Sequence, residues 1–411
     1  MTIFILNRYF YPDHSATSQL ATDLARELAA RGWNTVALCS TQSYDNASVY
    51  PPLGSCGGVS IVRVRGTHFG RHGHLGRAID YMSYVCGAAW KLMRIAKARD
   101  IVIALTDPPL LGTAMMPMVR FKRLRIVHWL QDVFPETAAA LGVIGPSLLY
   151  RTLGAARNWS LRRADAVVTI GRLMRQQVAR HARPDVVECI PNWALVESRA
   201  GPDTSADLRS EWGLGDAFVA AYSGNMGRAH ILMDLMDSMA LLRDFKGIRL
   251  LMVGDGAQLP ALRDRARSLQ LDAVSFRPYQ PLEFLRQQLL VADMHIVTLD
   301  PRLEGLVVPS KFVGVIALGK PVLFVGSPDG ELGTLIRETG CGVVVAPGAV
   351  QDLARAIADL ARDRDEGSPR LRAMSENALA LCARELQRSR AFDDWAGVIR
   401  RVESARRPGL Q

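Results

Sequence analysis

The sequence predicts an α/β protein of two Rossmann-like, doubly wound domains, each with a parallel sheet covered by helices. Short runs rich in β-branched residues alternate with amphipathic helical patterns, which is the rhythm of successive βαβ units. This rhythm occurs twice, in two series separated by a polar stretch. A chain of 411 residues, 49% hydrophobic and 22% charged, has enough apolar side chains for two or three domains with large cores.

The first series begins with a strand pattern at residues 2–6 and a helical pattern at 18–32. The apolar run at the N-terminus stops at Asn7 and Arg8, which is too short for a signal-peptide core or a membrane span, so export is not expected. The following strand patterns of this series are residues 35–40, 60–65, 100–106, 125–131, 166–171 and 186–192.

The second series has its strand patterns at residues 218–225, 249–256, 273–279, 294–300, 321–326 and 341–347. The polar stretch 194–216 precedes it, directly after the segment IPNW. We therefore expect domains at 1–193 and 194–411, with the last helix, about 386–405, as a segment that can cross back to the first domain. Ligands of open α/β sheets bind at the carboxyl ends of the strands, so a substrate is expected in a cleft that the two domains face.

The charge is distributed unevenly along the chain. Residues 1–195 hold 23 Lys and Arg against 12 Asp and Glu, a net charge of +11, whereas residues 196–411 hold 27 against 28. A basic domain indicates an anionic partner, either a membrane surface, a phosphorylated substrate or nucleic acid, or else a merely soluble basic surface. No nucleic-acid-binding motif is visible, so nucleic acid is not expected.

Two apolar segments of the basic half carry clusters of cations. Residues 79–99 have a helical pattern with apolar and aromatic residues first and Lys91, Arg94, Lys97 and Arg99 last. Residues 108–119 are uncharged, too short to span a bilayer, and followed by Arg120, Lys122, Arg123 and Arg125. These patterns are typical of helices that lie at a membrane interface, and equally of core helices with solvated ends.

Glycine-containing turns follow two strands of the second series. The segment YSGNMGRAH (222–230) is expected to end a strand and open a helix, so that amides near Gly224 to Gly227 face a phosphate, with Arg228 and His230 as added donors. It has neither the dinucleotide fingerprint nor the P-loop pattern, which disfavours an oxidoreductase and makes the turn alone a weak signal. The turn in MVGDGAQLPAL (252–262) is interpreted as structural.

These motifs, in their order, resemble the GT-B glycosyltransferases of family 4, especially the bacterial enzymes of surface polysaccharide and exopolysaccharide synthesis. The resemblance covers almost the whole chain and is strongest at residues 217–326. It rests on IPNW, YSGNMG, LLMVGDG, FRPY and EGLVVPSKF…ALGKPV, the last of which follows the strand ADMHIVTL.

The resemblance implies a set of donor-binding residues. Glu304, which begins EGLVVPSKF, matches the family's Glu beside the transferred sugar, while Lys311 and Arg228 match cationic partners of the diphosphate. Further donor contacts are expected from Gly224, Asn225, Gly227 and Tyr279. The family usually has a second Glu eight positions after the first, which contacts the ribose, and Phe312 stands there. For Glu304 the alternative is a rim residue without a ligand.

The first domain would supply the acceptor side. In HWLQDVFPE (128–136), Asp132 matches a residue near the sugar hydroxyls, although Gln131 stands where many relatives have His. A structural Asp that caps the turn before Pro135 is the alternative. His128 is interpreted as a satisfied strand histidine. Ser15 and Thr17 replace the glycines of a loop that approaches the diphosphate in relatives, and both residues could instead cap a helix.

The resemblance implies transfer of a hexose from a nucleoside-diphosphate sugar with retention at the anomeric carbon, without a metal or other cofactor. The expected acceptor is a polyprenyl-diphosphate-linked or other saccharide, and residues 79–125 would hold the protein to the inner face of the plasma membrane. A cytoplasmic location agrees with six scattered cysteines that have no paired spacing. The alternatives are a nucleotide-sugar epimerase of the same architecture and a non-catalytic partner subunit, which Phe312 would allow.

Overall fold

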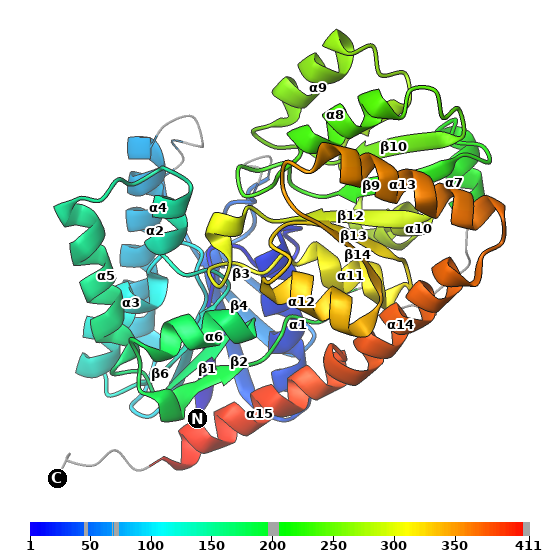
Figure 1. Cartoon of the computed structure of the whole chain (residues 1–411). Coiled ribbons are helices and arrows are strands. Elements are labelled where there is room, and N and C mark those ends of the chain that lie inside the picture. The colour runs from blue at the N-terminus through cyan, green and yellow to red at the C-terminus, as the bar shows by residue number, and fades with distance from the viewer. Residues whose placement is uncertain (45–47, 68, 70–73, 196–204, 406–411) are drawn as a thin grey trace. The chain divides into compact units, whose positions relative to one another are not determined.

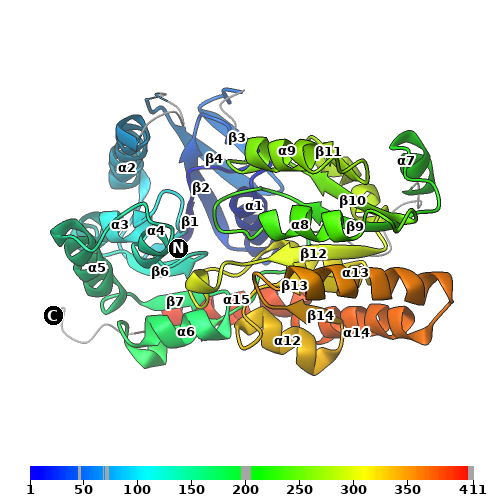
Figure 2. The same ribbon diagram turned by 45° about the horizontal axis from the view of Figure 1, so that its top comes forward.

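A computed structural model of the chain describes residues 1–44, 48–67, 69, 74–195 and 205–405, and it confirms the α/β class with two parallel-sheet units (Figures 1 and 2). Unit 1 comprises Met1–Pro191 with Ser389–Gln411, and unit 2 comprises Asn192–Arg388. Part of the expected linker, residues 196–204, lies outside the described residues. No described helix is both long enough and apolar enough to cross a bilayer.

Unit 1 is built on an eight-stranded sheet in the order β3-β4-β2-β1-β5-β6-β7-β8. Its strands are β1 (Thr2–Leu6), β2 (Asn34–Ser40), β3 (Leu53–Cys56), β4 (Val59–Val64), β5 (Ile101–Ala104), β6 (Arg125–Leu130), β7 (Ala166–Thr169) and β8 (Val187–Cys189). One edge of this sheet is antiparallel, because β3, which was not among the predicted strands, pairs antiparallel with β4. Gly57 and Gly58 join them in a two-residue turn with φ of 57° and 81°, which closes a tight hairpin.

The helices of unit 1 include the last helix of the chain. They are α1 (Ala16–Ala30), α2 (His74–Ile95), α3 (Leu111–Phe121), α4 (Glu136–Ala140), α5 (Leu148–Leu161), α6 (Arg172–Ala179), the 3-10 helix η1 (Pro184–Val186) and α15 (Arg388–Ser404). Trp395 of α15 packs edge-on against Trp129 of β6 with ring centres 4.9 Å apart, and both rings are fully buried. Arg125 donates to the carbonyls of Glu403 and Ala405 at 2.5 and 3.1 Å. Helix α15 is therefore part of the core of unit 1.

Unit 2 is built on a six-stranded parallel sheet in the order β11-β10-β9-β12-β13-β14. Its strands are β9 (Phe218–Ser223), β10 (Ile248–Val253), β11 (Val274–Arg277), β12 (Met294–Thr298), β13 (Val322–Val325) and β14 (Gly342–Val345). Its helices are α7 (Ser205–Glu211), α8 (Met233–Leu241), α9 (Leu259–Ser268), η2 (Leu282–Phe284), α10 (Leu285–Leu290), η3 (Pro301–Leu303), α11 (Lys311–Ala317), α12 (Glu331–Thr339), α13 (Val350–Asp365) and α14 (Pro369–Glu385).

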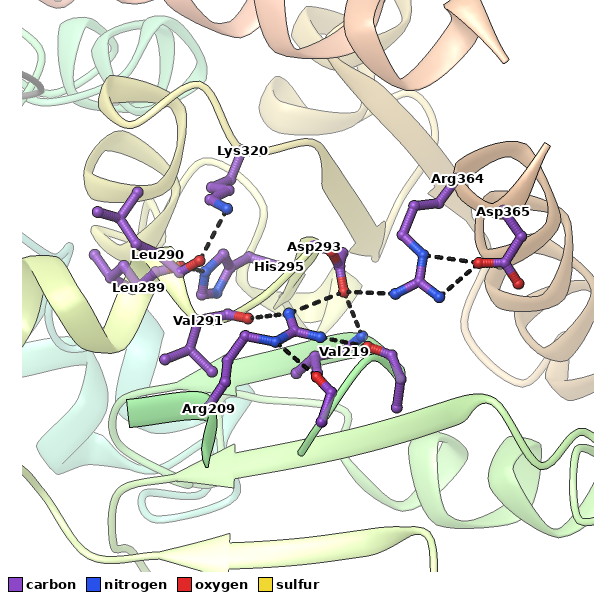
Figure 3. A network of polar contacts seen from close by, with 12 residues as sticks. Arg209, Val219, Leu289, Leu290, Val291, Asp293, His295, Lys320, Arg364 and Asp365 are labelled. Carbon is purple, nitrogen blue, oxygen red and sulfur yellow. Dashed lines mark hydrogen bonds and ion pairs between the residues drawn. The ribbon is translucent and has the colours of Figure 1, made fainter. Parts of the chain in front are cut away.

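A polar network fixes the amino-terminal ends of β9 and β12 (Figure 3). One carboxylate oxygen of Asp293 accepts from the amide of Val219 at 2.7 Å and lies within 3.6 Å of the guanidinium groups of Arg209 and Arg364. His295 bonds the carbonyl of Leu289 at 2.8 Å. This network ties α7 and α13 to the two central strands at the edge opposite their carboxyl ends, where ligands of such sheets bind.

Candidate functional site

The carboxyl ends of β9 and β12 meet where the strand order of unit 2 reverses, the position at which doubly wound sheets bind their ligands. The glycine turn after β9 lies here, and the side chain of Lys311, the first residue of α11, extends over it. A Cβ added to Gly224 would lie 2.4 Å from Cε of Lys311, and Gly224 has a φ of 131°. Glycine is therefore required at 224 both by the backbone and by the passage of the lysine.

Three acceptors surround the Lys311 amine. Its Nζ donates to the Tyr222 hydroxyl, to the Asn225 carbonyl at 3.3 Å and to Nε2 of His230 at 3.1 Å. Nζ also lies 4.2 Å from the centre of the Tyr222 ring, close enough for a cation–π contact. Tyr222 donates its own proton to the Asn225 carbonyl at 2.7 Å. The amine is thus held in one position above the glycine turn.

The contacts of His230 determine which of its ring nitrogens carries the proton. Nδ1 lies 2.9 Å from the carbonyl oxygen of Thr298, which can only accept, so Nδ1 is protonated. In the neutral ring Nε2 then has a lone pair directed at Lys311. Burial and the neighbouring Lys311 charge lower the pKa of His230 to about 3, which keeps the ring neutral at physiological pH.

Burial lowers the pKa of Lys311 to about 7. The charged form of Lys311 loses hydration in this position, and its neighbours replace that hydration only in part. The lysine is therefore only partly protonated near pH 7, and an anion bound beside it would favour the fully protonated form. A cation of this kind beside a glycine turn suits a phosphate group.

The backbone of the glycine turn after β9 is fixed by contacts with the glycine turn after β10, and no helix begins within it. The amide of Met226 donates to the Asp255 carbonyl at 2.7 Å, and a Cβ on Gly256 would lie 2.6 Å from the Met226 backbone. Gln258 binds the carbonyls of Gly227 and His230 at 2.6 and 2.9 Å. The expectation that the turn opens a helix at Gly227 is wrong, because α8 begins only at Met233.

Glu304 follows β12 and directly succeeds η3. Its Oε2 accepts from the amide of Glu331 at the start of α12, at 3.2 Å, while its Oε1 is buried and has no hydrogen-bond partner among the described residues. Burial raises the pKa of this half-buried carboxyl group. A Cβ on Gly330 would lie 2.2 Å from Oε1, so the glycine makes room for the carboxylate. One oxygen of Glu304 thus stabilises the start of α12, and the other is left without a hydrogen-bond partner among the described residues.

The remaining predicted donor residues of unit 2 differ in exposure. Asn225 and Arg228 are exposed beside the glycine turn, and Tyr279 is exposed in the loop after β11. Phe312 is only 1% exposed and lies in the core. A ribose contact from position 312 is therefore not available in this structure, and the phenylalanine there is a packing residue.

Asp132 lies after β6 in unit 1 and lines a small cavity with Thr106, Gly112, His128 and Arg157. Its Oδ1 is buried and finds no hydrogen-bond partner within the described residues. Burial raises the pKa of Asp132 to about 6, against a hydrogen bond from Thr106 that lowers it. The orphaned oxygen can accept a hydrogen bond from a hydroxyl group that enters the cavity.

The neighbours of Asp132 are structural. His128 is buried and bonds Ser160 through Nε2 at 2.9 Å, as a satisfied strand histidine would, and burial lowers its pKa to about 4. Arg157, also buried, forms a bidentate ion pair with Glu136 at 2.6 and 3.0 Å. This pair fixes the loop that carries Asp132.

Ser15 and Thr17 lie at the start of α1 in unit 1. Ser15 has the position of the N-cap, yet its side chain makes no capping bond, and its buried hydroxyl oxygen has no partner in the described part of the chain. Thr17 is half-buried. Capping by its side chain therefore does not account for Ser15.

The sequence interpretation missed Tyr222 as a member of the site and named His230 only as an added donor. Both residues flank the glycine turn, so their spacing from Gly224 was the available signal. No group of three or more His, Cys, Asp and Glu side chains that could hold a metal ion occurs within the ranges that the structure describes.

Comparisons with known proteins agree with this arrangement. The glycosyl transferase 4-like domain matches residues 16–193, and the glycosyl transferases group 1 matches residues 217–363. The probable glycosyltransferase WbjE of Pseudomonas aeruginosa is 31% identical over 283 residues, which are 66% of this chain and 68% of WbjE.

A second relative and a solved structure extend the comparison. WcaI of Escherichia coli (strain K12), which carries the name of a colanic acid biosynthesis glycosyl transferase, is 25% identical over 69% of this chain and 72% of its own. HepE of Anabaena, solved in complex with UDP-glucose, superposes with a TM-score of 0.72 at 16% identity, over 97% of this chain and 99% of HepE. At this identity the structural match shows the fold.

Proposed function

This chain belongs to the glycosyltransferases of the GT-B fold, and from that premise we propose that it transfers a hexose from a nucleoside-diphosphate sugar to a saccharide acceptor with retention of the anomeric configuration. WcaI is named for colanic acid biosynthesis, which supports a role in bacterial polysaccharide assembly. The complex of HepE with UDP-glucose supports a nucleoside-diphosphate sugar as the donor.

The observation that carries the proposal is the Lys311 amine, held over the glycine turn by Tyr222, Asn225 and His230. A departing diphosphate needs positive charge where its own charge develops, and a preorganised donor can supply it without reorganisation. Lys311, over the glycine turn, and the exposed Arg228, which directly follows Gly227, are two cationic residues at the switch point. In this mechanism the charge comes from the chain, with no metal ion.

Glu304 and Asp132 are proposed to hold sugar hydroxyls. Each has one buried carboxylate oxygen without a partner among the described residues, and an incoming hydroxyl would satisfy that oxygen. The departing diphosphate oxygen takes the proton of the acceptor hydroxyl on the same face, which gives retention without an enzyme nucleophile. Ser15 and Thr17 are proposed as further contacts of the diphosphate, and Tyr279, exposed in its loop, as a contact of the nucleoside.

The proposed acceptor is a saccharide linked to a polyprenyl diphosphate at the cytoplasmic face of the membrane. Such an acceptor is anionic and lipid-bound, and the net charge of +11 over residues 1–195 complements it. The protein would then act as a peripheral protein of that membrane surface.

The test measures transfer of labelled sugar from UDP-, GDP- and ADP-sugars into the lipid extract of bacterial membranes. Lys311→Ala should lower the rate by about 10²–10³-fold, the loss seen when one preorganised donor to a developing anion is removed. Lys246→Ala, at an exposed lysine of unit 2, is the matched control and should retain the wild-type rate.

Other outcomes identify the alternatives. Conversion of the donor into a second soluble nucleotide sugar, without label in lipid, would indicate the epimerase. A chain that binds none of the donors would fit a non-catalytic subunit. Because Phe312 is buried, position 312 offers no contact to the ribose, and donor binding is the measurement that decides between a transferase and a non-catalytic subunit.

A further inference from the structure

Helix α2 exposes an apolar stripe to solvent. Leu75, Ile79, Met82 and Trp90 recur at intervals of three, four and eight residues, so they lie on one face, and each keeps 48% to 82% of its surface exposed. The opposite face, with Tyr84 and the following residues Ala88 and Leu92, is buried. A helix of a soluble domain normally shows polar residues on its outer face, whereas α2 has apolar residues on both its buried face and this outer stripe.

The neighbouring helices also expose large apolar residues. Helix α3 contacts both α2 and α5, and the three lie side by side in Figure 1. Phe121, the last residue of α3, is 73% exposed, and Leu148 and Leu149, the first residues of α5, are 76% and 57% exposed. Single exposed apolar residues are ordinary, but a set that spans three adjacent helices marks a surface that binds something apolar.

The charged residues of the same three helices indicate an anionic partner. Asp80 is the only acidic residue of α2, α3 and α5, and it is buried. Arg77, Arg94, Arg120 and Arg151 are exposed on these helices. The outer surface of the three helices is therefore apolar and cationic, without an exposed carboxylate.

The surroundings of Trp90 are typical of a membrane interface. The Arg94 guanidinium lies 3.8 Å from the centre of the indole ring, and Lys91 Nζ lies 5.5 Å from it. An indole bracketed by two cations can lie at the depth of lipid headgroups, with the cations against phosphate and the ring toward the acyl chains.

We infer that the outer face of α2, together with Phe121 and the start of α5, docks on an anionic lipid bilayer. We name this surface the α2 face. A second copy of the chain is a poorer partner, because symmetric pairing would bring the arginines of one copy against those of the other. The inference adds a defined binding surface to the proposed function, and it depends on that function only for its biological purpose.

The test is co-sedimentation with vesicles of phosphatidylcholine, with and without about one quarter phosphatidylglycerol. The wild type should bind the anionic vesicles, and added salt should weaken that binding. Met82→Glu should reduce the affinity about tenfold or more, because it places a carboxylate in the apolar stripe against anionic lipid. Leu241→Glu is the matched control, since Leu241 is also about half exposed but belongs to α8 of unit 2.

Three results would overturn the inference. The wild type could fail to bind phosphatidylglycerol vesicles, Met82→Glu could bind them as well as the wild type does, or the wild type could be a dimer that Met82→Glu dissociates. Circular dichroism and thermal unfolding, measured in parallel without vesicles, report the folded state of each variant. The vesicles contain neither donor nor acceptor, so failure here would leave the proposed sugar transfer standing, and failure of transfer would leave the vesicle result standing.

Discussion

The affinity of the protein for UDP should fall as the pH rises above 7, because Lys311 must gain a proton to meet the diphosphate. Burial lowers the pKa of the free lysine to about 7, whereas a bound diphosphate would raise it again. Binding therefore takes up a proton over the pH range between these two values. The last ionisation of the UDP diphosphate has a pKa of about 6, so most of the group is already fully charged at pH 7 and its own titration contributes little above that pH.

The size of the effect follows from the shifted pKa. With a pKa of about 7, roughly half of the lysine is charged at pH 7 and about one part in eleven at pH 8. If the complex keeps the lysine charged, the dissociation constant should rise about fivefold from pH 7 to pH 8 and about fiftyfold from pH 7 to pH 9. The second factor corresponds to about 2.3 kcal/mol of binding free energy.

Isothermal titration calorimetry of UDP at pH 7, 8 and 9, in buffers of different ionisation enthalpy, measures both the affinity and the proton uptake. Lys311→Met keeps the length of the side chain but cannot be charged, so its weaker affinity should not change with pH, and the wild type should approach it as the pH rises. Lys246→Ala is the control and should follow the wild type. An affinity of the wild type that is constant from pH 7 to pH 9, without proton uptake, would refute the assigned role of Lys311.

Three further predictions concern the backbone, the core and the acceptor side. Gly224→Ala should weaken UDP binding and lower the free energy of unfolding by about 1–3 kcal/mol, because the added Cβ would clash with Lys311 and the backbone φ is strained for alanine. Gly247→Ala, which has open space around it, is the control and should bind UDP normally. Trp395→Ala should lower the free energy of unfolding by about 3–5 kcal/mol in a denaturant titration, because the ring is completely buried. Burial raises the pKa of Asp132 from an ordinary 3.8 to about 6, so the free energy of unfolding of the protein should fall as the pH rises between these values. Asp132→Asn should accordingly be more stable than the wild type by up to about 3 kcal/mol at pH 7.5, with little difference near pH 4, in urea unfolding at both pH values.

The sequence predicted the strands of both sheets well, because buried parallel strands are short β-branched runs that local composition reveals. It missed β3, whose LGSC sequence has no such run and whose pairing is set by the hairpin turn at Gly57 and Gly58. The sequence interpretation also placed the start of the helix after the glycine turn too early, at Gly227 instead of Met233. That boundary depends on Gln258, which is remote in sequence and holds the turn in a non-helical conformation.

The candidate site was predicted residue by residue but not as an arrangement. Glu304, Lys311 and Gly224 were each named from their motifs. The contact of Lys311 with Tyr222, 89 positions earlier in the chain, depends on the pairing of β9 with β12 and cannot be read from any local period. The stripe on α2 is visible as a pattern, but only its exposure distinguishes an outer face from a core face.

The core position of α15 has a consequence for synthesis. Unit 1 takes its first part from residues up to Pro191 and its last helix from beyond Arg388, so the whole of unit 2 is translated in between. Until α15 emerges from the ribosome, the indole of Trp129 has no ring to pack against, and the nascent first unit carries an uncovered hydrophobic face. A fragment that stops at Pro191 would retain this exposed face and be prone to aggregation, whereas residues 192–388 contain a complete sheet with its own covering helices. The second unit is therefore the part to express alone for donor-binding studies, and the first should be produced together with a peptide that contains α15.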